Sequence, residues 1–301
     1  MAILDYYKDV STAIDYYLSD VKTSKIGGIK TIELEDLYRI AKKLGFENQM
    51  RNTQVLAIGP FKKVEFVSMG LQNFNNETLK RIADIWIRHC KKVPGAFPGN
   101  VASLNSFETI GETIMIRYNE ATFDQYIGTK RNGFSVLDLE NPSYNKKVCL
   151  PISMGATTVT SDGKIPVGIR GKQKVSIAQG KAVSLPSGFL DPKEHIDHKK
   201  NLSIETLVKA ELKEELKEKQ LIKLEILGII QVPDTRQPMF VIELKIPSTG
   251  EEIKQRLQKE IEMEEIDEIV FIKDNIEAVR DAGLNWTIDS MVKFAFHFAK
   301  Q

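Results

Sequence analysis

Cysteine is scarce in this chain. Only Cys90 and Cys149 occur among 301 residues, and two thiols are too few for the disulfide framework that stabilises small secreted domains. The composition therefore excludes a disulfide-rich scaffold and fits a reducing compartment. We expect both cysteines to be ordinary buried thiols.

Long hydrophobic runs are also lacking. Residues Met1–Leu18 include Asp and Lys and hold no continuous apolar stretch, so they do not have the pattern of a secretory signal peptide. No segment approaches the roughly 20 consecutive apolar residues that a membrane-spanning helix needs. We expect a cytoplasmic protein with no membrane partner.

Neither sign of charge is in excess. The 42 Lys and Arg residues balance 41 Asp and Glu residues, for a net charge of +1. This balance does not favour general electrostatic binding to nucleic acid, although a nucleotide ligand needs only a local patch of charge. Hydrophobic residues make up 42% of the chain, enough for a packed core, and the length predicts two domains or one large one.

What the chain does have is a cluster of carboxylates with helical spacing. Glu211, Glu214 and Glu215 are three and four positions apart within Ala210–Leu216, so a helix would place them on one face. Like charges at this spacing repel each other, whereas a divalent cation would reverse the sign of that interaction. Hard cations such as Mg²⁺ prefer oxygen ligands, usually one or two carboxylates together with substrate phosphates. The pattern therefore predicts a site for Mg²⁺ or Mn²⁺.

The helix that carries this cluster is expected to begin at Ser203, a good N-cap residue. An apolar residue recurs at every fourth position, which predicts a stripe that packs against a sheet: Ile204, Val208, Leu212 and Leu216. Lys217 stands where a helix end would favour Gly, so we expect the helix to continue through Lys219.

The segment from Gly188 to Glu218 resembles the Nudix box, whose pattern is Gly, five residues, Glu, seven residues, then Arg-Glu-aliphatic-any-Glu-Glu-any-Gly-aliphatic. The residues that match are Gly188, Glu194, Glu211, Leu212, Glu214 and Glu215. The residues that depart from the pattern are Ala210, Lys217 and Glu218. The gap after Glu194 is also longer than the pattern allows, and we place the extra length in the polar stretch His195–Leu202, where an insertion costs little.

Two flanking segments have the order that this resemblance implies. Upstream, Thr157–Gly171 contains two β-like segments joined by Asp162-Gly163, a strong hairpin signal, and Arg170 closes the second segment. Downstream, the acidic stretch Glu264–Lys273 leads into a strand and then a helix. The resemblance therefore extends over residues 145–301.

The resemblance implies a Nudix-type pyrophosphohydrolase, a metal-dependent enzyme that hydrolyses a nucleoside diphosphate linked to another group. Nucleotide sugars, ADP-ribose and dinucleotides all fit as substrates. Its implied catalytic and metal-binding residues are Glu211, Glu214, Glu215 and Glu194, with the first three as ligands of Mg²⁺ or Mn²⁺. A backbone carbonyl beside Gly188 would complete the protein ligands. Glu194 is a supporting residue whose usual arginine partner is replaced by Ala210.

Basic residues near the expected site are candidates for binding the substrate phosphates. Arg170 at a strand end and Arg236 in the loop Asp234–Pro238 have the guanidinium group that suits bidentate phosphate binding, and Lys172 is a further candidate. Hydrolysis also needs a general base. The sequence leaves five candidates for it: Glu251, Glu252, Glu262, Glu264 and Glu265.

Other interpretations stay open. The Glu-rich helix also fits an ordinary solvated face. A Nudix-fold protein with an altered box would bind or sense a nucleotide without efficient turnover, and an interaction protein built around the N-terminal half is the third alternative. His195 and His198 lack the further ligands of a closed zinc site, so we expect loop residues. His297, among phenylalanines, is expected to be a packing or surface residue.

We expect an α+β protein with a mixed α/β N-terminal domain over residues 1–144 and a Nudix-like α/β/α sandwich with a mixed sheet over residues 145–301. The boundary is set by the turn-forming residues Asn141-Pro142-Ser143. Periodicity in the first half predicts helices over Ala2–Val21, Leu34–Leu44 and Asn76–Lys92, and strands over Gln54–Gly59, Lys63–Ser68 and Thr109–Tyr118. Nudix proteins often carry an N-terminal domain that helps them dimerise, so the resemblance leaves a homodimer open.

Overall fold

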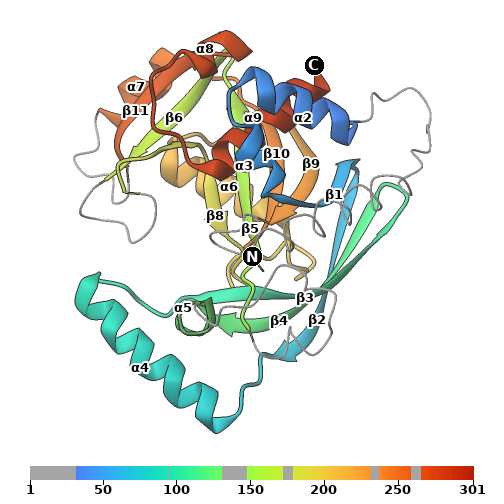
Figure 1. The fold of residues 1–301 in the computed structure, drawn as a ribbon, viewed down its shortest axis with the longest axis vertical. Coiled ribbons are helices and arrows are strands. Elements are labelled where there is room, and N and C mark those ends of the chain that lie inside the picture. Colours follow the sequence, from blue (N-terminus) through green and yellow to red (C-terminus); the bar gives the residue numbers. More distant parts are fainter. Residues whose placement is uncertain (1–31, 94, 131–147, 172–178, 232–236, 259–265) are drawn as a thin grey trace, which may run out of the picture. The chain divides into compact units, whose positions relative to one another are not determined.

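The computed structural model describes residues 32–93, 95–130, 148–171, 179–231, 237–258 and 266–301. Its largest sheet has five strands in the order β1-β9-β10-β5-β8 (Figure 1). Their bounds are β1 Gln54–Phe61, β9 Lys223–Gln231, β10 Pro238–Lys245, β5 Ser153–Val159 and β8 Ser187–Phe189. Strands β10 and β5 are parallel and the other neighbours are antiparallel, so the sheet is mixed, as expected.

A second sheet has three antiparallel strands, in the order β11 (Ile266–Lys273), β6 (Lys164–Arg170) and β7 (Ala182–Ser184). The expected turn at Asp162-Gly163 joins β5 to β6, with Gly163 at a φ of 69°. The hairpin prediction is nevertheless wrong, because β5 pairs with β10 and β8 while β6 pairs with β11 and β7. Strand β5 lies inside the larger sheet, between β10 and β8, and it is buried on both faces.

Helices cover both faces of the five-stranded sheet. In β10, Phe240, Ile242 and Leu244 belong to one apolar core with helix α6 (Ile204–Glu215). Met239 and Val241 belong to a second core, with helices α9 (Ile288–Lys300) and α2 (Leu34–Lys43). Successive side chains of a strand point to opposite faces, so this alternation places α6 on one face and α9 on the other. The expected α+β class is confirmed.

Three short helices complete this part of the fold: α3 Glu47–Arg51, α7 Gly250–Leu257 and α8 Ile276–Arg280. Strand β11 followed by α8 has the order expected for the acidic stretch near residue 266. Helix α9 is capped by Thr287, whose hydroxyl accepts a hydrogen bond from the Ser290 N–H.

A third sheet is formed by residues from the first half of the chain. Its order is β2-β4-β3, with bounds β2 Lys63–Leu71, β4 Thr113–Thr122 and β3 Asn100–Ile110. Helices α4 (Asn76–Lys92) and α5 (Phe123–Lys130) pack on each other beside it. The expected strand Thr109–Tyr118 is wrong at its start, because Gly111 has a φ of 59° and turns the chain between β3 and β4.

The predicted boundary at residue 144 lies outside the described residues and stays a prediction, as does the helix expected over Ala2–Val21. Elements from the first half nevertheless join the second half. Strand β1 pairs with β9, α2 packs on α9, and the Leu104 N–H of β3 donates to the Leu150 carbonyl at 2.8 Å.

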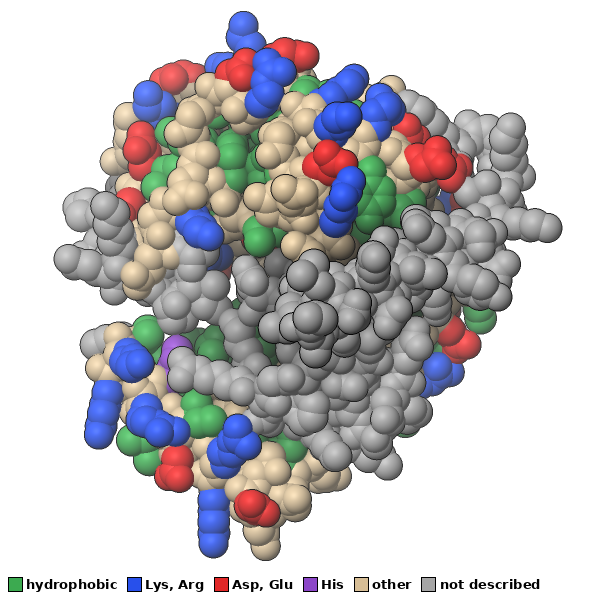
Figure 2. Space-filling model, in the orientation of Figure 1, with side chains coloured by type: hydrophobic (Ala, Val, Ile, Leu, Met, Phe, Trp, Pro, Cys, Tyr) green, Lys and Arg blue, Asp and Glu red, His purple; other side chains and the backbone are tan. Residues whose placement is uncertain are grey.

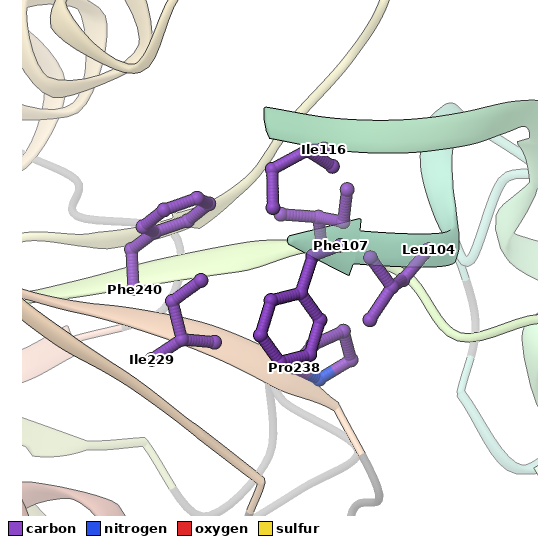
Figure 3. Close-up of a pocket in the computed structure, with 7 residues that line it drawn as sticks. Leu104, Phe107, Ile116, Ile229, Pro238 and Phe240 are labelled. Carbon is purple, nitrogen blue, oxygen red and sulfur yellow. The ribbon is translucent and has the colours of Figure 1, made fainter. Parts of the chain in front are cut away.

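Apolar side chains of β3 and β4 also meet those of β9 and β10 (Figure 3). They enclose a cavity of about 10 Å³ lined by Leu104, Phe107, Ile116, Ile152, Ile229, Pro238 and Phe240. A space this small and apolar is at the lower limit for a single water molecule. It is a packing defect of the core and no ligand site.

The surface agrees with the balanced composition. Figure 2 shows lysine, arginine, aspartate and glutamate side chains interspersed over the upper half of the visible face. Among the described residues, no helix is long and apolar enough to cross a membrane.

Candidate functional site

Helix α6 forms as its sequence predicts. The Ser203 hydroxyl caps it by accepting a hydrogen bond from the Thr206 N–H at 3.3 Å. The expected apolar stripe is buried: Ile204, Val208, Leu212 and Leu216. Glu211 and Glu215 are half-buried beside this stripe, whereas Glu214 is exposed. The helix therefore presents two of the three candidate carboxylates at the edge of the core.

Gly188 in strand β8 allows the closest approach between α6 and the sheet. A Cβ atom added at residue 188 would lie 1.9 Å from Glu211 Oε1 and 2.3 Å from its Cδ. A side chain there would force the Glu211 carboxylate to move, because real Cβ atoms essentially never come within 3.0 Å of another heavy atom, and the atoms in the way are the far end of this flexible side chain. The glycine of the expected box thus brings the Glu211 carboxylate directly against the backbone of β8.

Glu215 reaches the same short strand. Its Oε2 accepts a hydrogen bond from the Ser187 N–H at 3.1 Å. Two carboxylates one helical turn apart are therefore held at neighbouring backbone positions, Ser187 and Gly188. The structure brings together Glu211, Glu215 and Gly188, as the sequence predicts, and leaves Glu214 on the solvent side.

These residues fit a divalent cation with few protein ligands. Among the described residues, no group of three or more His, Cys, Asp and Glu side chains is arranged to hold a metal ion. Mg²⁺ does not require such a cage, since it usually binds one or two carboxylates and takes its remaining ligands from water and substrate phosphates. Gly188 lets the Glu211 carboxylate lie at the strand beside the Glu215 contact, so two carboxylates are close together, as such a site needs.

The long loop before α6 is a folded turn. Asp191 Oδ1 accepts hydrogen bonds from the N–H groups of Lys193 and Glu194, and residues Ile196 and Leu202 form an isolated antiparallel bridge. His195 is buried, and its Nδ1 accepts a hydrogen bond from the Asp191 N–H at 2.9 Å. Burial lowers the pKa of His195, although the charges of Asp191 and Glu194 oppose that shift. The side chain of Glu194 is exposed, so its supporting role stays a prediction.

The end of α6 differs from the expectation. The helix ends at Glu215, and Lys217 has a φ of 52°, the left-handed conformation for which the family pattern has Gly. Continuation through Lys219 is therefore wrong. At this end the Glu218 N–H donates to the Leu212 carbonyl at 3.1 Å. The buried Glu218 carboxylate accepts hydrogen bonds from the Lys219 and Gln220 N–H groups and from the distant Ser248 hydroxyl, so the chain leaves the helix axis there.

Glu218, where the pattern has an aliphatic residue, is an anchor. It binds the Ser248 hydroxyl and lies 3.1 Å from an Arg256 guanidinium nitrogen on α7. Burial raises its pKa, but the hydrogen bonds from Ser248, the Gln220 N–H and Arg256 outweigh burial and hold the pKa below its ordinary value. This departure from the box therefore has a structural role.

Among the candidate phosphate ligands, Arg170 ends β6 and is half-buried. Its N–H donates to the Lys181 carbonyl at 3.0 Å and its carbonyl accepts from the Gly180 N–H at 2.8 Å, so its backbone is held. Arg236, Lys172 and three candidate bases (Glu262, Glu264 and Glu265) lie outside the described residues. The other two, Glu251 and Glu252, are exposed on α7, where Glu252 forms a capping box with Thr249.

Sequence reasoning missed Lys293 on α9. Its side chain is fully buried, with Nζ 3.4 Å from Asp289 Oδ2 and 3.4 Å from the Ser184 carbonyl oxygen. The signal was available, because Lys293 interrupts an otherwise apolar run from Met291 to Phe296 and has Asp289 four positions before it. Such a spacing on a helix predicts an ion pair.

His297 is also more than a packing residue. It is buried between two carboxylates, with Nδ1 2.8 Å from Glu243 Oε2 and Nε2 2.6 Å from Asp274 Oδ1. Burial alone would lower its pKa, but the two carboxylates outweigh burial and raise it. The imidazole ring therefore links α9 to β10 and to the turn after β11.

Comparison with known proteins does not assign this site. No family model and no curated protein matches the chain. Among solved structures, it is similar to the crystal structure of DR0079 from Deinococcus radiodurans, with 18% sequence identity and a TM-score of 0.30, over 45% of this chain and 75% of that chain. At that TM-score the similarity carries no argument about function, which is argued below from the residues alone.

Proposed function

We propose that this protein is a metal-dependent pyrophosphohydrolase that acts on a nucleoside diphosphate linked to a second group, such as a sugar or another nucleotide. The observation that carries the proposal is the contact of β8 with α6. There a glycine without space for a Cβ atom places Glu211 against the strand, and Glu215 binds the adjacent Ser187 N–H.

The chain's own residues supply the binding and orientation. Glu211 and Glu215 would hold Mg²⁺ or Mn²⁺, with a backbone carbonyl beside Gly188 as a further ligand, and the exposed Glu214 would face the water around the ion. Arg170 would bind the phosphate oxygens. When bound, the cation lowers the pKa of a water molecule and neutralises charge on the phosphates. A cytoplasmic location is part of this proposal, and the sparse cysteine content supports it.

The test is hydrolysis across a panel of nucleoside diphosphate derivatives in Mg²⁺ or Mn²⁺, comparing wild type with Glu211→Gln and Glu215→Gln. Because loss of even an outer partner of a metal ligand costs about 10–100-fold, loss of a ligand should lower kcat/KM by at least about 100-fold. Glu205→Gln is the matched control, since Glu205 is exposed on the same helix and pairs with Lys209. Equal activity of all four proteins would overturn the assignment.

A second candidate is a nucleotide-binding or regulatory protein with little turnover. One observation favours it: Glu218 stands in the box as a structural anchor, where the pattern has an aliphatic residue. Binding of a nucleoside diphosphate derivative by wild type, measured calorimetrically, with no detectable hydrolysis in either metal, would select this candidate over the enzyme.

A further inference from the structure

The buried ammonium group of Lys293 lies beneath the proposed site. A charged group inside a protein needs compensating partners, and the partners of Lys293 are the Asp289 carboxylate and the Ser184 carbonyl oxygen. Asp289 is on the same helix, one turn earlier. Ser184 is the last residue of β7, and the next four residues lead to Gly188. Lys293 therefore joins α9 to the start of the segment that carries the site.

Strand β5 makes room for this ammonium. A Cβ atom added at Gly155 would lie 2.8 Å from both Cδ and Nζ of Lys293. Gly155 also pairs with Ser187 in the ladder between β5 and β8. The position of the lysine side chain is thus defined by the strand next to the site.

Backbone groups along the segment Ser184–Gly188 form hydrogen bonds with neighbouring elements. Beyond the Lys293 contact at Ser184, the Leu185 carbonyl accepts from the Thr158 hydroxyl at 2.7 Å, and the Pro186 carbonyl accepts from the Ala156 N–H at 2.9 Å. The Ser187 N–H donates to Glu215. The Ser184 N–H also donates to the Ser290 hydroxyl of α9 at 3.0 Å. Lys293 adds to this contact a fully buried side chain that lies between Ser184 and Gly155, so its removal should shift the start of the segment.

The charges of the site act on Lys293 in turn. Burial lowers the pKa of the ammonium, the Asp289 and Glu215 carboxylates oppose that shift, and the Arg170 guanidinium adds to it. Two residues of the proposed site, one on α6 and one on β6, are therefore close enough to interact electrostatically with a side chain on α9.

We propose that Lys293 is a positioning residue of the metal site, which holds the Ser184–Gly188 segment so that its backbone and Glu215 can bind a divalent cation. This inference rests on the proposed function. It assigns to the terminal helix a part in cation binding without any contact to substrate. Outer partners of metal ligands typically change metal affinity about 10–100-fold when removed.

The experiment measures Mn²⁺ binding to the full chain by electron paramagnetic resonance of the free ion, with no substrate present. Lys293→Met removes the charge, and Gly155→Ala keeps the charge but displaces it, because the atoms in its way are the flexible ends of Lys293 and Met239. Lys300→Met is the matched control: it lies on the same helix and pairs with Glu225 and Glu243. Thermal unfolding without metal shows that the variants are folded.

We expect the Mn²⁺ dissociation constant to rise about ten-fold or more in Lys293→Met and Gly155→Ala, and to stay within about two-fold of wild type in Lys300→Met. Unchanged or tighter binding in the first two variants would overturn the positioning role while leaving the proposed function intact. If Lys293→Met does not fold, Gly155→Ala decides the question. Absence of Mn²⁺ binding by wild type would contradict both the proposed function and this inference.

Discussion

Replacing Gly188 by alanine is the sharpest test of the contact between β8 and α6. The new Cβ would lie 1.9 Å from Glu211 Oε1, 2.3 Å from its Cδ and 2.9 Å from its Cγ. The backbone of Gly188 is outside the left-handed region, so alanine adds no backbone strain there. The main destabilising effect of the substitution should therefore come from the clash with Glu211.

The size of the effect follows from the geometry. An ordinary contact begins at 3.4 Å, so the Glu211 carboxylate must retreat by about 1.5 Å or the helix must shift. Because the atoms in the way are the far end of a flexible, half-buried side chain, the cost is that of forcing Glu211 out of its preferred rotamer, about 0.5–1.5 kcal/mol. A misplacement of about 1 Å in a catalytic group can also lower activity about 100-fold.

A double-mutant cycle separates the clash from other effects of alanine. Urea unfolding is measured for wild type, Gly188→Ala, Glu211→Ala and the double variant. Because Glu211→Ala removes all three clashing atoms, Gly188→Ala should then lower the unfolding free energy by only a few tenths of a kcal/mol. A parallel cycle with the exposed Glu214→Ala should show no coupling. An equal cost of Gly188→Ala with and without Glu211 would refute the packing described here.

Three further outcomes follow from residues outside that contact. The carboxylates that raise the pKa of His297 stabilise the folded protein while the imidazole is protonated. The unfolding free energy should therefore fall as the pH rises above about 6.5, the pKa of histidine in the unfolded chain. In urea titrations from pH 6 to 9, His297→Gln should flatten that dependence. Lys217→Gly should raise the unfolding free energy by about 0.5–1 kcal/mol. The glycine removes the backbone strain of a lysine with positive φ, and this gain exceeds the loss from a more flexible unfolded chain. Lys217→Ala should give no gain, because alanine is strained at that φ as well. Glu218→Gln should destabilise the protein by about 2–3 kcal/mol in chemical unfolding, since it removes a buried charge that Ser248 and Arg256 bind; a loss below about 0.5 kcal/mol would show that the anchor is unimportant.

Local patterns predicted local structure well. The cap and the apolar stripe of α6 follow from one residue type and a spacing of four. Helix α4 has the predicted bounds Asn76–Lys92, although its Leu79 is 43% exposed. These features depend on neighbours in sequence, which a pattern records directly.

Features that depend on distant residues were not predictable in this way. The turn at Asp162-Gly163 is present, but sheet membership of β5 and β6 is decided by β10 and β11, which come much later in the chain. The left-handed Lys217 likewise results from the burial of Glu218 against α7. Periodicity carries no information about such partners.

The residues of the candidate site also divide into those that local sequence predicts and those that depend on distant partners. The spacing of Glu211 and Glu215 predicted that they share a helix face, and the structure places both at β8. The contribution of Lys293 could not be ranked from sequence, because its partner carbonyl at Ser184 is more than a hundred positions away. A single lysine within an apolar run indicates a buried lysine, but its partner can be named only when the neighbouring strands are known.

The pairing of β1 with β9 limits how this protein can be divided. A fragment that starts at residue 145 would lose β1 and the cover of α2 on α9, leaving β9 as an unprotected edge strand whose residues 226–230 are entirely apolar. Exposed edges of this kind promote association between chains. Size-exclusion chromatography of residues 145–301 and of residues 32–301 would show the difference, with aggregation expected only for the shorter fragment. Deletion series and binding assays on this chain should therefore begin before α2.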